Sequence, residues 1–331
     1  MRARVSLEAS RALRTLVNAR GSGARAREAR ARRGAATRAG SLGGKHFLLE
    51  WSSRVDVADA RRAALETAAY DGIVVPDVPS RFSVEDVDGG GRGGGRWTCR
   101  TTSGTRGERD ATARALAHVE RAAREGTNVA ILCVSGEGGE GVSEAVLRAL
   151  SRARARGEVP KRTTLLAAVN PMLGAVEAER VLRKRECGAD GFITQPTLGM
   201  MRRFDAWREA CERARVWDGL EAAGEGRDPP RGLYLGVAAV RDARGLEFWF
   251  KLTGVDSRAD DDARALVEEY ASRAKTMSAE RFDAWTFERL ELATTHAASI
   301  DAAAGVHVMP ITSGGYVHAA RLAESVIPMF K

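Results

Sequence analysis

The chain has 331 residues, of which 44% are hydrophobic and 29% are charged. This length and composition are typical of a globular protein with a large core, and no window reaches the roughly 18 apolar residues of a membrane-spanning helix. The formal net charge of +8 belongs to the start of the chain, because residues 1–45 carry eleven Arg and one Lys against Glu8 and Glu28, a net +10. The other 286 residues sum to −2, which argues against a nucleic-acid-binding body.

Residues 1–45 are rich in Arg, Ala, Gly and Ser and contain no aromatic residue. An Arg-rich, acid-poor composition is typical of a transit peptide that directs a protein to the chloroplast or the mitochondrion. A basic arm that binds nucleic acid has a similar composition and is the alternative. We expect a disordered transit peptide here, since no nucleic-acid module follows it, and a folded region over residues 46–331.

From residue 46 onward, short apolar runs alternate with amphipathic segments. The runs predict eight buried strands, at residues 46–51, 72–76, 97–102, 128–134, 163–169, 190–194, 232–240 and 305–311. Helical periodicity predicts helices at residues 56–69, 109–125, 142–156, 174–187, 200–215, 262–275, 279–303 and 316–326. This alternation predicts an α/β fold, the (β/α)8 TIM barrel. A doubly wound open sheet is the competing fold, but it lacks here the Gly-rich phosphate loop expected after its first strand.

Two segments between the predicted strands have the composition of loops. Residues 88–96 read DGGGRGGGR, and residues 220–232 read LEAAGEGRDPPRG. The four cysteines form no CxxC pair and lie far apart in the sequence. This spacing predicts buried free thiols and argues against a disulfide framework or a zinc site.

Polar residues stand where most of the predicted strands end. In a TIM barrel the active site gathers at the carboxyl ends of the strands. The residues expected there are Glu50, Asp77, Arg100, Glu137, Asn170, Gln195, Arg241 and Thr312, with His307 nearby. They contain no cluster of His and Asp of the kind that metal-dependent hydrolases use. No metal is therefore predicted, and chemistry carried by an organic cofactor is favoured.

Two Gly-rich turns precede helices at the same end of the predicted barrel. The sequence SGEGGEG (135–141) follows the fourth strand, and TSGGY (312–316) follows the eighth. Backbone N–H groups at such helix N-termini can bind phosphate. The alternative is that each turn only closes a loop.

Residues 181–195, VLRKRECGADGFITQ, combine a basic helix end, a Gly-Ala-Asp turn and a strand that ends in Gln195. This segment resembles a motif of the methylenetetrahydrofolate reductase family, in which a Lys and a Gln stand eleven positions apart, as Lys184 and Gln195 do here. Other segments are similar to that family in the same order: FLLEWSSR (47–54), VAILCVSGEGG (129–139), AAVNP (167–171) and GVHVMPIT (305–312). The resemblance runs in patches from residue 46 to residue 325.

This resemblance implies a flavin-dependent enzyme that reduces 5,10-methylenetetrahydrofolate to 5-methyltetrahydrofolate with NAD(P)H as the electron donor. It implies FAD rather than FMN as the cofactor and a folate as the small-molecule substrate, with no nucleic acid or membrane as partner; a homo-oligomer is left open. It assigns cofactor binding to Ser135, Gly136, Glu137, Arg180, Arg183 and Lys184, substrate binding to Gln195, and the role of general acid to Glu50.

Glu50 stands at the end of the first predicted strand, among Phe47, Leu49 and Trp51. Burial against these side chains would raise the pKa of the carboxyl group. The reaction implied by the resemblance needs an acid that is still protonated near neutral pH, so that the methylene bridge of the substrate can open. The alternative is a structural salt bridge from Glu50 to a nearby arginine, Arg54 or Arg100.

The chain also departs from the family pattern. Ser52 and Ser53 stand where the family has a double Pro, and Asn170 and Pro171 replace a Tyr and a His. The regulatory domain of the eukaryotic enzymes has no counterpart, so inhibition by S-adenosylmethionine is not expected. Three alternatives follow: a reductase of the same barrel group with a non-folate substrate, a non-catalytic relative, and a phosphate-binding lyase or isomerase that uses Glu50.

Overall fold

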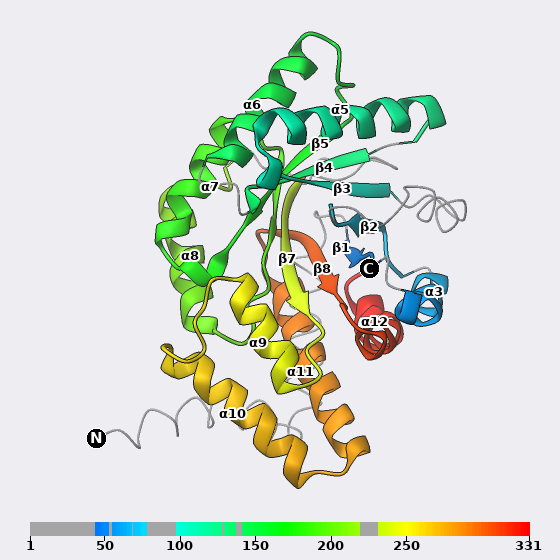
Figure 1. The fold of residues 1–331 in the computed structure, drawn as a ribbon, viewed down its shortest axis with the longest axis vertical. Helices are drawn as coiled ribbons and strands as arrows, with labels where there is room; N and C mark the ends of the chain where they lie inside the picture. Colours follow the sequence, from blue (N-terminus) through cyan, green and yellow to red (C-terminus); the bar gives the residue numbers. More distant parts are fainter. Residues whose placement is uncertain are drawn as a thin grey trace. The chain divides into compact units, whose positions relative to one another are not determined.

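Eight parallel strands form a closed barrel within residues 45–331 (Figure 1). The computed structural model describes residues 44–52, 55–67, 69–77, 97–127, 129–136, 141–218 and 231–331. The strands are β1 (His46–Glu50), β2 (Gly72–Val75), β3 (Trp97–Ser103), β4 (Val129–Val134), β5 (Thr164–Val169), β6 (Gly191–Thr194), β7 (Gly232–Ala238) and β8 (Ala303–Met309). Each strand pairs with the next in sequence and β8 pairs with β1, which confirms the predicted TIM barrel.

Helices follow the strands and cover the outside of the barrel. They are α3 (Ala58–Glu66), α5 (Glu108–Glu125), α6 (Val142–Ala155), α7 (Val176–Glu186), α8 (Met201–Arg213), α9 (Ala243–Leu252), α10 (Asp261–Thr276), α11 (Ala279–Ser299) and α12 (Ser313–Ser325). In Figure 1, α5 to α8 run along one side of the barrel, and α3 lies against α12. Every predicted helix is found. The structure also contains α9, which the sequence analysis did not predict.

Several predictions fall on residues that the structure does not describe. The predicted transit peptide lies outside the described residues apart from its last two positions. The Gly-rich loop at 88–96 also lies outside them, as do residues 220–230 of the second loop. The four cysteines, by contrast, are all described, and each is a buried free thiol as predicted.

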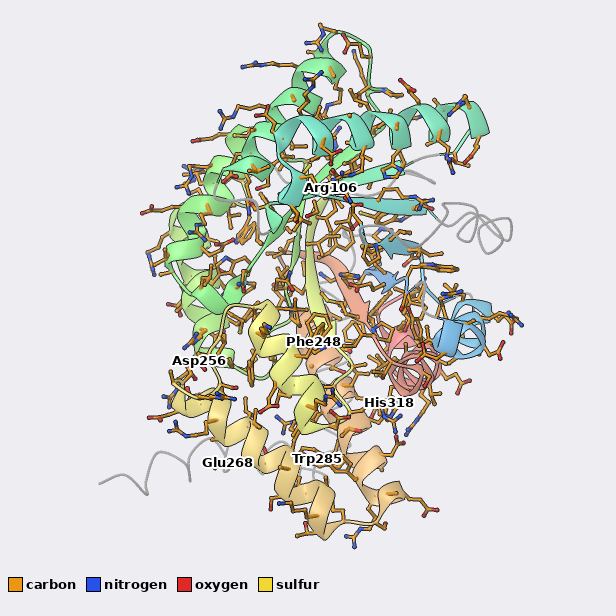
Figure 2. The ribbon with its side chains drawn as sticks, viewed as in Figure 1. Arg106, Phe248, Asp256, Glu268, Trp285 and His318 are labelled. Carbon is orange, nitrogen blue, oxygen red and sulfur yellow. The ribbon has the colours of Figure 1, made fainter. Side chains whose placement is uncertain are left out.

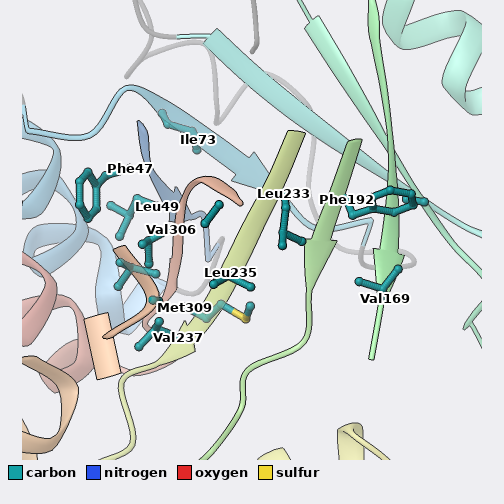
Figure 3. Packing of buried hydrophobic residues seen from close by; sticks show 14 of the residues in the cluster. Phe47, Leu49, Ile73, Val169, Phe192, Leu233, Leu235, Val237, Val306 and Met309 are labelled. Carbon is teal, nitrogen blue, oxygen red and sulfur yellow. The ribbon is translucent and has the colours of Figure 1, made fainter. Parts of the chain in front are cut away.

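The strands are apolar throughout because both of their faces are covered, one by helices and the other by the opposite strands. Alternate residues therefore belong to two separate clusters. The cluster inside the barrel contains Leu48, Val74, Trp97, Cys99, Ala130, Leu132, Leu166, Ile193, Tyr234 and Ala304. The cluster between strands and helices includes Phe47, Leu49, Phe192 and Val306, which Figure 3 shows beside their neighbours.

Large side chains fill the amino-terminal end of the barrel interior. Trp97 opens β3 and packs edge-to-face against Tyr234 of β7, with 6.1 Å between ring centroids. Gly72 of β2 provides the room, since a Cβ atom there would stand 2.8 Å from the Trp97 ring. A packed floor at this end leaves the carboxyl ends of the strands as the face where a ligand can be placed.

The seam between β1 and β8 closes the barrel. The pairing of these strands places His307 opposite Leu48. Gly305 allows the close approach, because a Cβ atom at this position would collide with the carbonyl oxygen of His46. Residues of the first and the last strand are thereby brought into one layer of the barrel interior.

The segments that flank the barrel in sequence also meet. The backbone N–H of Lys45 donates to the carbonyl oxygen of Phe330 at 3.0 Å. The side chain of Lys331 pairs with Asp71 at 2.7 Å, next to the start of β2. Residues before β1 and after α12 are thus tied together beside the closing seam.

Candidate functional site at the carboxyl ends of the strands

Glu50 is the last residue of β1, and its side chain points into the barrel. The inward direction follows from alternation along the strand, since Leu48 belongs to the inner cluster. The carbonyl oxygen of Glu50 accepts a hydrogen bond from the Tyr316 hydroxyl at 2.6 Å, and that hydroxyl accepts one from the Ser52 N–H at 2.7 Å. A buried tyrosine of α12 thus fixes the end of the strand, while the Glu50 side chain keeps 22% of its exposure.

Burial raises the pKa of Glu50 from its ordinary value to about 7. The cause is the loss of solvent around the carboxylate, which disfavours the charged form. A salt bridge to an arginine would move the pKa of Glu50 in the opposite direction, so the raised value favours the acid interpretation over the structural one. At neutral pH about half of the Glu50 side chains are neutral and able to give a proton.

His307 of β8 is the titratable side chain that faces Glu50. Its Nε2 atom lies 3.6 Å from Oε2 of Glu50, slightly beyond hydrogen-bond distance. The His307 side chain is buried, and burial lowers its pKa to about 3, so the imidazole is neutral at physiological pH. Among the described residues, neither ring nitrogen has a hydrogen-bond partner.

Two other polar side chains face the barrel interior toward the carboxyl ends of the strands. Gln195 follows β6, where its backbone N–H is bound by the Val169 carbonyl oxygen, and its carboxamide makes no hydrogen bond to any described residue. Thr101 lies on the inward face of β3, two positions after Cys99. Gly236 allows β7 to pack closely against the end of β6, since a Cβ atom there would stand 3.1 Å from the Gln195 carbonyl carbon. The structure therefore brings Gln195 and Glu50 to the same end of the barrel.

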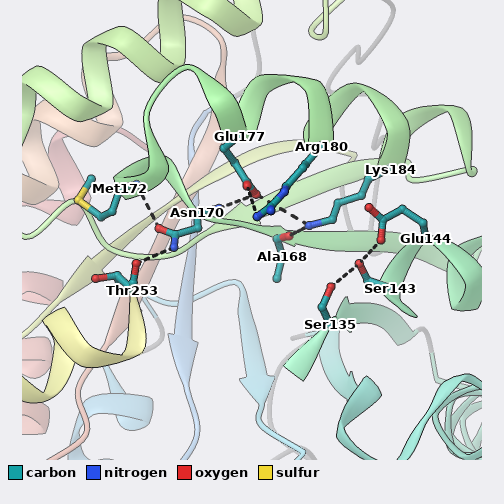
Figure 4. A network of polar contacts seen from close by, with 10 residues as sticks. All are labelled: Ser135, Ser143, Glu144, Ala168, Asn170, Met172, Glu177, Arg180, Lys184 and Thr253. Carbon is teal, nitrogen blue, oxygen red and sulfur yellow. Dashed lines mark hydrogen bonds and ion pairs between the residues drawn. The ribbon is translucent and has the colours of Figure 1, made fainter. Parts of the chain in front are cut away.

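Lys184 lies in a buried network between α7 and β5 (Figure 4). Its Nζ donates to the carbonyl oxygen of Ala168 at 2.7 Å and lies 3.9 Å from Glu177, which is itself buried. Burial lowers the pKa of Lys184 and raises that of Glu177, and the attraction between the two charges opposes both shifts. These contacts tie α7 to the barrel, and the assignment of Lys184 to a cofactor phosphate stays a prediction.

The turn after β4 is described only in part. Ser135 shares a hydrogen bond of 2.9 Å with Ser143, which in turn donates to Glu144 at the start of α6. Gly136 has a left-handed backbone (φ 64°) and lies so close to the hydroxyl of Thr105 that a Cβ would not fit. Glu137 lies outside the described residues.

Arg180 and Arg183 are both on α7. Arg180 is half-buried and lies 3.6 Å from Glu177, and Arg183 is exposed. The structure places them on the helix that carries Lys184, so the three basic residues share one element. A shared helix does not show contact with a phosphate, so the role of Arg180 and Arg183 in cofactor binding stays a prediction.

Most other residues predicted at the strand ends have structural partners. Asp77 accepts from the Ser103 N–H and pairs with Arg114 of α5. Asn170 bonds the Thr253 carbonyl oxygen, Thr312 caps α12, and Arg241 pairs with Asp283 of α11. The contacts of these four side chains are structural, since each stabilises a loop or a helix.

Arg100 is a correction to the predicted ring. β3 continues to Ser103, three residues beyond Arg100, and Cys99 faces the barrel interior. Arg100 therefore points outward. There the pKa of His118 on α5 is lowered first by burial and then by the positive charge of Arg100. The predicted strand, 97–102, agrees with β3 to within one residue, but Arg100 lies in its interior, and alternation along the strand places its side chain on the outer face.

The described residues contain no group of three or more His, Cys, Asp or Glu side chains arranged to hold a metal ion. None of the helices in the described part of the chain is long and apolar enough to span a membrane. The inward-facing polar groups at this end of the barrel include the carboxyl group of Glu50, the neutral imidazole of His307 and the amide of Gln195. Such groups suit proton transfer and the recognition of a polar ring.

Comparison with protein-family models finds no match, and comparison with curated proteins finds none. The solved structures that match include one described as "PhdJ bound to substrate intermediate", which is 12% identical over 87% of this chain and 98% of that chain, with a TM-score of 0.35. At this identity and TM-score the likeness carries no argument about ligand or reaction. The fold class rests on the closed barrel itself.

Proposed function

We propose that this barrel is a flavin-dependent reductase in which Glu50 protonates a methylene-bridged substrate, reducing 5,10-methylenetetrahydrofolate to 5-methyltetrahydrofolate with NAD(P)H as donor. One observation carries the proposal: an inward-facing carboxyl group at the end of β1 has its pKa raised to about 7 by burial. The resemblance of residues 181–195 to a reductase motif supports the choice of substrate.

The reaction explains why an acid of this kind is needed. The bridging carbon of the substrate is bound to two nitrogens, and reduction requires one C–N bond to break. Protonation of that nitrogen lets the ring open to an iminium, whose carbon then accepts hydride. A carboxyl group with an ordinary pKa would be ionised at neutral pH, whereas Glu50 retains a proton there.

Polar groups at the carboxyl ends of the strands support the proposal of a bound flavin ring. Gln195 presents an amide without a partner among the described residues, and Ser135 and Gly136 follow β4 at the same end of the barrel. The flavin, when bound, would supply the hydride. Lys184 donates to a backbone carbonyl oxygen and Arg180 is paired with Glu177, so binding of the flavin phosphates by Arg180, Arg183 or Lys184 rests on the resemblance.

The first experiment is the absorbance spectrum of the purified full-length protein, followed by anaerobic addition of NADH or NADPH. The proposal expects a flavin spectrum that bleaches with one of them and returns when methylenetetrahydrofolate is added. In the Glu50→Gln protein the flavin should still bleach. The rate at which its spectrum returns with the folate should fall by about a hundredfold or more, because the proton donor is gone. Glu120→Gln, an exposed site on α5, is the matched control and should behave as the unaltered protein.

The outcomes separate the rival functions. A yellow protein that bleaches but ignores the folate indicates a reductase with another substrate. A protein that neither contains flavin nor takes it up on refolding contradicts the proposal. If Glu50→Gln performs both half-reactions at the normal rates, the role of the acid is wrong even if the protein is a reductase.

A second candidate, a phosphate-binding lyase or isomerase, is favoured by one other observation. Arg241 packs against Gly314 in the first turn of α12, and Arg241, Arg321 and His318 all contact the carboxylate of Asp283. This leaves positive charge near a helix N-terminus that follows β8. Calorimetric titration with inorganic phosphate tests it, and saturable binding by a colourless protein would favour this candidate over the reductase.

A further inference from the structure

His307 is an unusual residue for its position in the barrel. Its side chain is 3% exposed, and among the described residues both ring nitrogens lack a hydrogen-bond partner. A neutral imidazole has one N–H donor and one acceptor nitrogen, and leaving either unsatisfied in the interior costs free energy. Leu or Met would fill the same space without that cost, so packing alone does not explain a histidine here.

The closing seam of the barrel directs this imidazole toward Glu50. His307 lies opposite Leu48, the residue two positions before Glu50 on the same face of β1. The Nε2 atom consequently lies 3.6 Å from Oε2 of Glu50, close enough for a small side-chain rotation to complete a hydrogen bond. The two residues come from the first and the last strand, so the contact exists only in the closed barrel.

Both groups are neutral near the pH at which Glu50 would act. Burial is the cause of both pKa shifts, upward for Glu50 and downward for His307, and no charged group among the described residues contributes to either. A neighbouring titratable group is Tyr316 of α12. Burial raises its pKa, the hydrogen bond from the Ser52 N–H lowers it, and the charges of Glu50 and Arg61 raise and lower it by smaller amounts. An ion pair between Glu50 and His307 is therefore not the arrangement that the structure favours.

A neutral acid and a neutral imidazole can meet in two ways. The acid can donate its O–H from Oε2 to Nε2, which directs the proton away from any ligand. Alternatively Nε2–H can donate to Oε2, which leaves the acidic proton on Oε1. Because Oε2 faces the buried imidazole while the Glu50 side chain keeps 22% exposure, only the second arrangement presents the proton to a substrate.

We propose that His307 is a positioning residue that donates from Nε2 to Oε2 of Glu50 and so fixes the acidic proton on Oε1, toward the carboxyl ends of the strands. The inference deepens the proposed function, because it rests on Glu50 being the proton donor. It does not depend on the identity of the substrate, and it can be tested on the protein without any ligand.

The first test titrates the Glu50 carboxyl group by infrared difference spectroscopy on the full-length protein. The C=O band of the acid is assigned by its loss in Glu50→Gln. A donor to Oε2 stabilises the carboxylate more than the acid, so His307→Leu should raise the pKa of Glu50 by about one unit, a tenfold change in proton affinity. The band should also move to higher frequency when the C=O loses its donor.

His307→Gln is the conservative variant, since its amide carries N–H donors at a similar reach. It should restore both the band and the pKa of Glu50 to near the values of the unaltered protein. An unchanged pKa in His307→Leu would show a purely structural residue, and a lowered pKa would show that His307 accepts the proton instead. Either result overturns the proposal, as does a His307→Gln protein that behaves like His307→Leu.

A second measurement needs no folded variant at position 307. The ¹⁵N chemical shifts of the labelled imidazoles report which ring nitrogen carries the proton. The proposal expects the Nε2–H tautomer for His307, and an Nδ1–H tautomer contradicts it. If the tautomer and the pKa shift are found but no folate turnover occurs, the proposed substrate fails while the role of His307 stands.

Discussion

Glu50 combines a buried position at the carboxyl ends of the strands with an energetic cost to the fold. Its pKa is about 7 in the folded protein, against an ordinary value of 4.5. Between these two values the folded state binds more protons than the unfolded state, so this group makes stability fall as pH rises through the window. Below about pH 4 both states are protonated at this site, and the contribution of Glu50 to the pH dependence vanishes.

Glu50→Gln should therefore be more stable than the unaltered protein at alkaline pH. The expected gain in the free energy of unfolding is up to about 3 kcal/mol at about pH 8, and it should disappear by about pH 4. Urea denaturation across this pH range measures it. Glu120→Gln, at an exposed site, should show no such pH-dependent difference. A constant offset between Glu50→Gln and the unaltered protein would mean that the pKa of Glu50 is not raised.

Lys184, unlike Glu50, is a buried charged group with buried partners. Lys184→Met leaves Glu177 inside the protein with Arg180 as its remaining cationic neighbour. We expect a loss of about 3 kcal/mol in the free energy of unfolding near pH 7, smaller at acidic pH where Glu177 is protonated. The double variant Lys184→Met/Glu177→Gln should recover most of the loss. If instead Lys184→Met keeps its stability and loses only flavin affinity, Lys184 contacts the cofactor as the sequence suggested.

Sequence reasoning could identify Glu50 because a carboxylate at the end of an apolar run is conspicuous. It could place His307 only in the neighbourhood, because its relation to Glu50 depends on the pairing of β1 with β8, 257 positions apart in sequence. The partners of Lys184 were equally hidden, since the carbonyl oxygen of Ala168 carries no signal in an amino-acid sequence.

At the scale of elements, continuous apolar runs were sufficient to locate all eight strands. The largest boundary error is at the end of α11, which was expected to reach residue 303 and ends at Ser299. The Ala-rich stretch after it favours a helix by propensity. Pairing of Ala303 with Leu233 overrides that propensity and starts β8 two residues earlier than expected.

The missed helix α9 has a recognisable start that was overlooked. Asp242 accepts a hydrogen bond from the Gly245 N–H at 2.6 Å, and Leu246, Trp249 and Phe250 recur at helical spacing on the buried face. Phe248 of the same helix, which is labelled in Figure 2, is exposed. A mixture of buried and exposed aromatic residues obscured the periodicity.

The cap of α9 can be tested by Asp242→Ala. Removing the side-chain acceptor should cost about 1 kcal/mol of stability, because the Gly245 N–H then loses its partner. The midpoint of urea denaturation should fall accordingly. Glu247→Ala, at an exposed site on the same helix, is the control and should change stability by no more than about 0.5 kcal/mol. Equal effects of the two substitutions would show that the cap contributes nothing measurable.

At the scale of the whole molecule, the barrel depends on close backbone contact at its closing seam. Gly305→Ala places a methyl group against the carbonyl oxygen of His46 and should separate β1 from β8. We expect a loss of about 2 kcal/mol or more, measured by thermal or urea unfolding.

Gly245→Ala is the matched control for this substitution. It makes the same chemical change within α9, where the new methyl group meets only Asp242 Oδ1, at 3.3 Å. Alanine is the better helix former, so this variant should be as stable as the unaltered protein or more stable by up to about 1 kcal/mol. Equal losses in the two variants would contradict the importance of the seam.

The meeting of Lys45 with Phe330 has a consequence for how the protein could be re-engineered. Because the two flanks of the barrel touch, a short peptide could link residue 331 to residue 45, and new termini could be opened elsewhere on the surface. In such a circular permutant, Glu50 and His307 would be near neighbours in sequence order instead of being synthesised first and last. With the new termini opened just before β8, the contact between Glu50 and His307 would form early in translation, whereas in the natural order it must await the final strand.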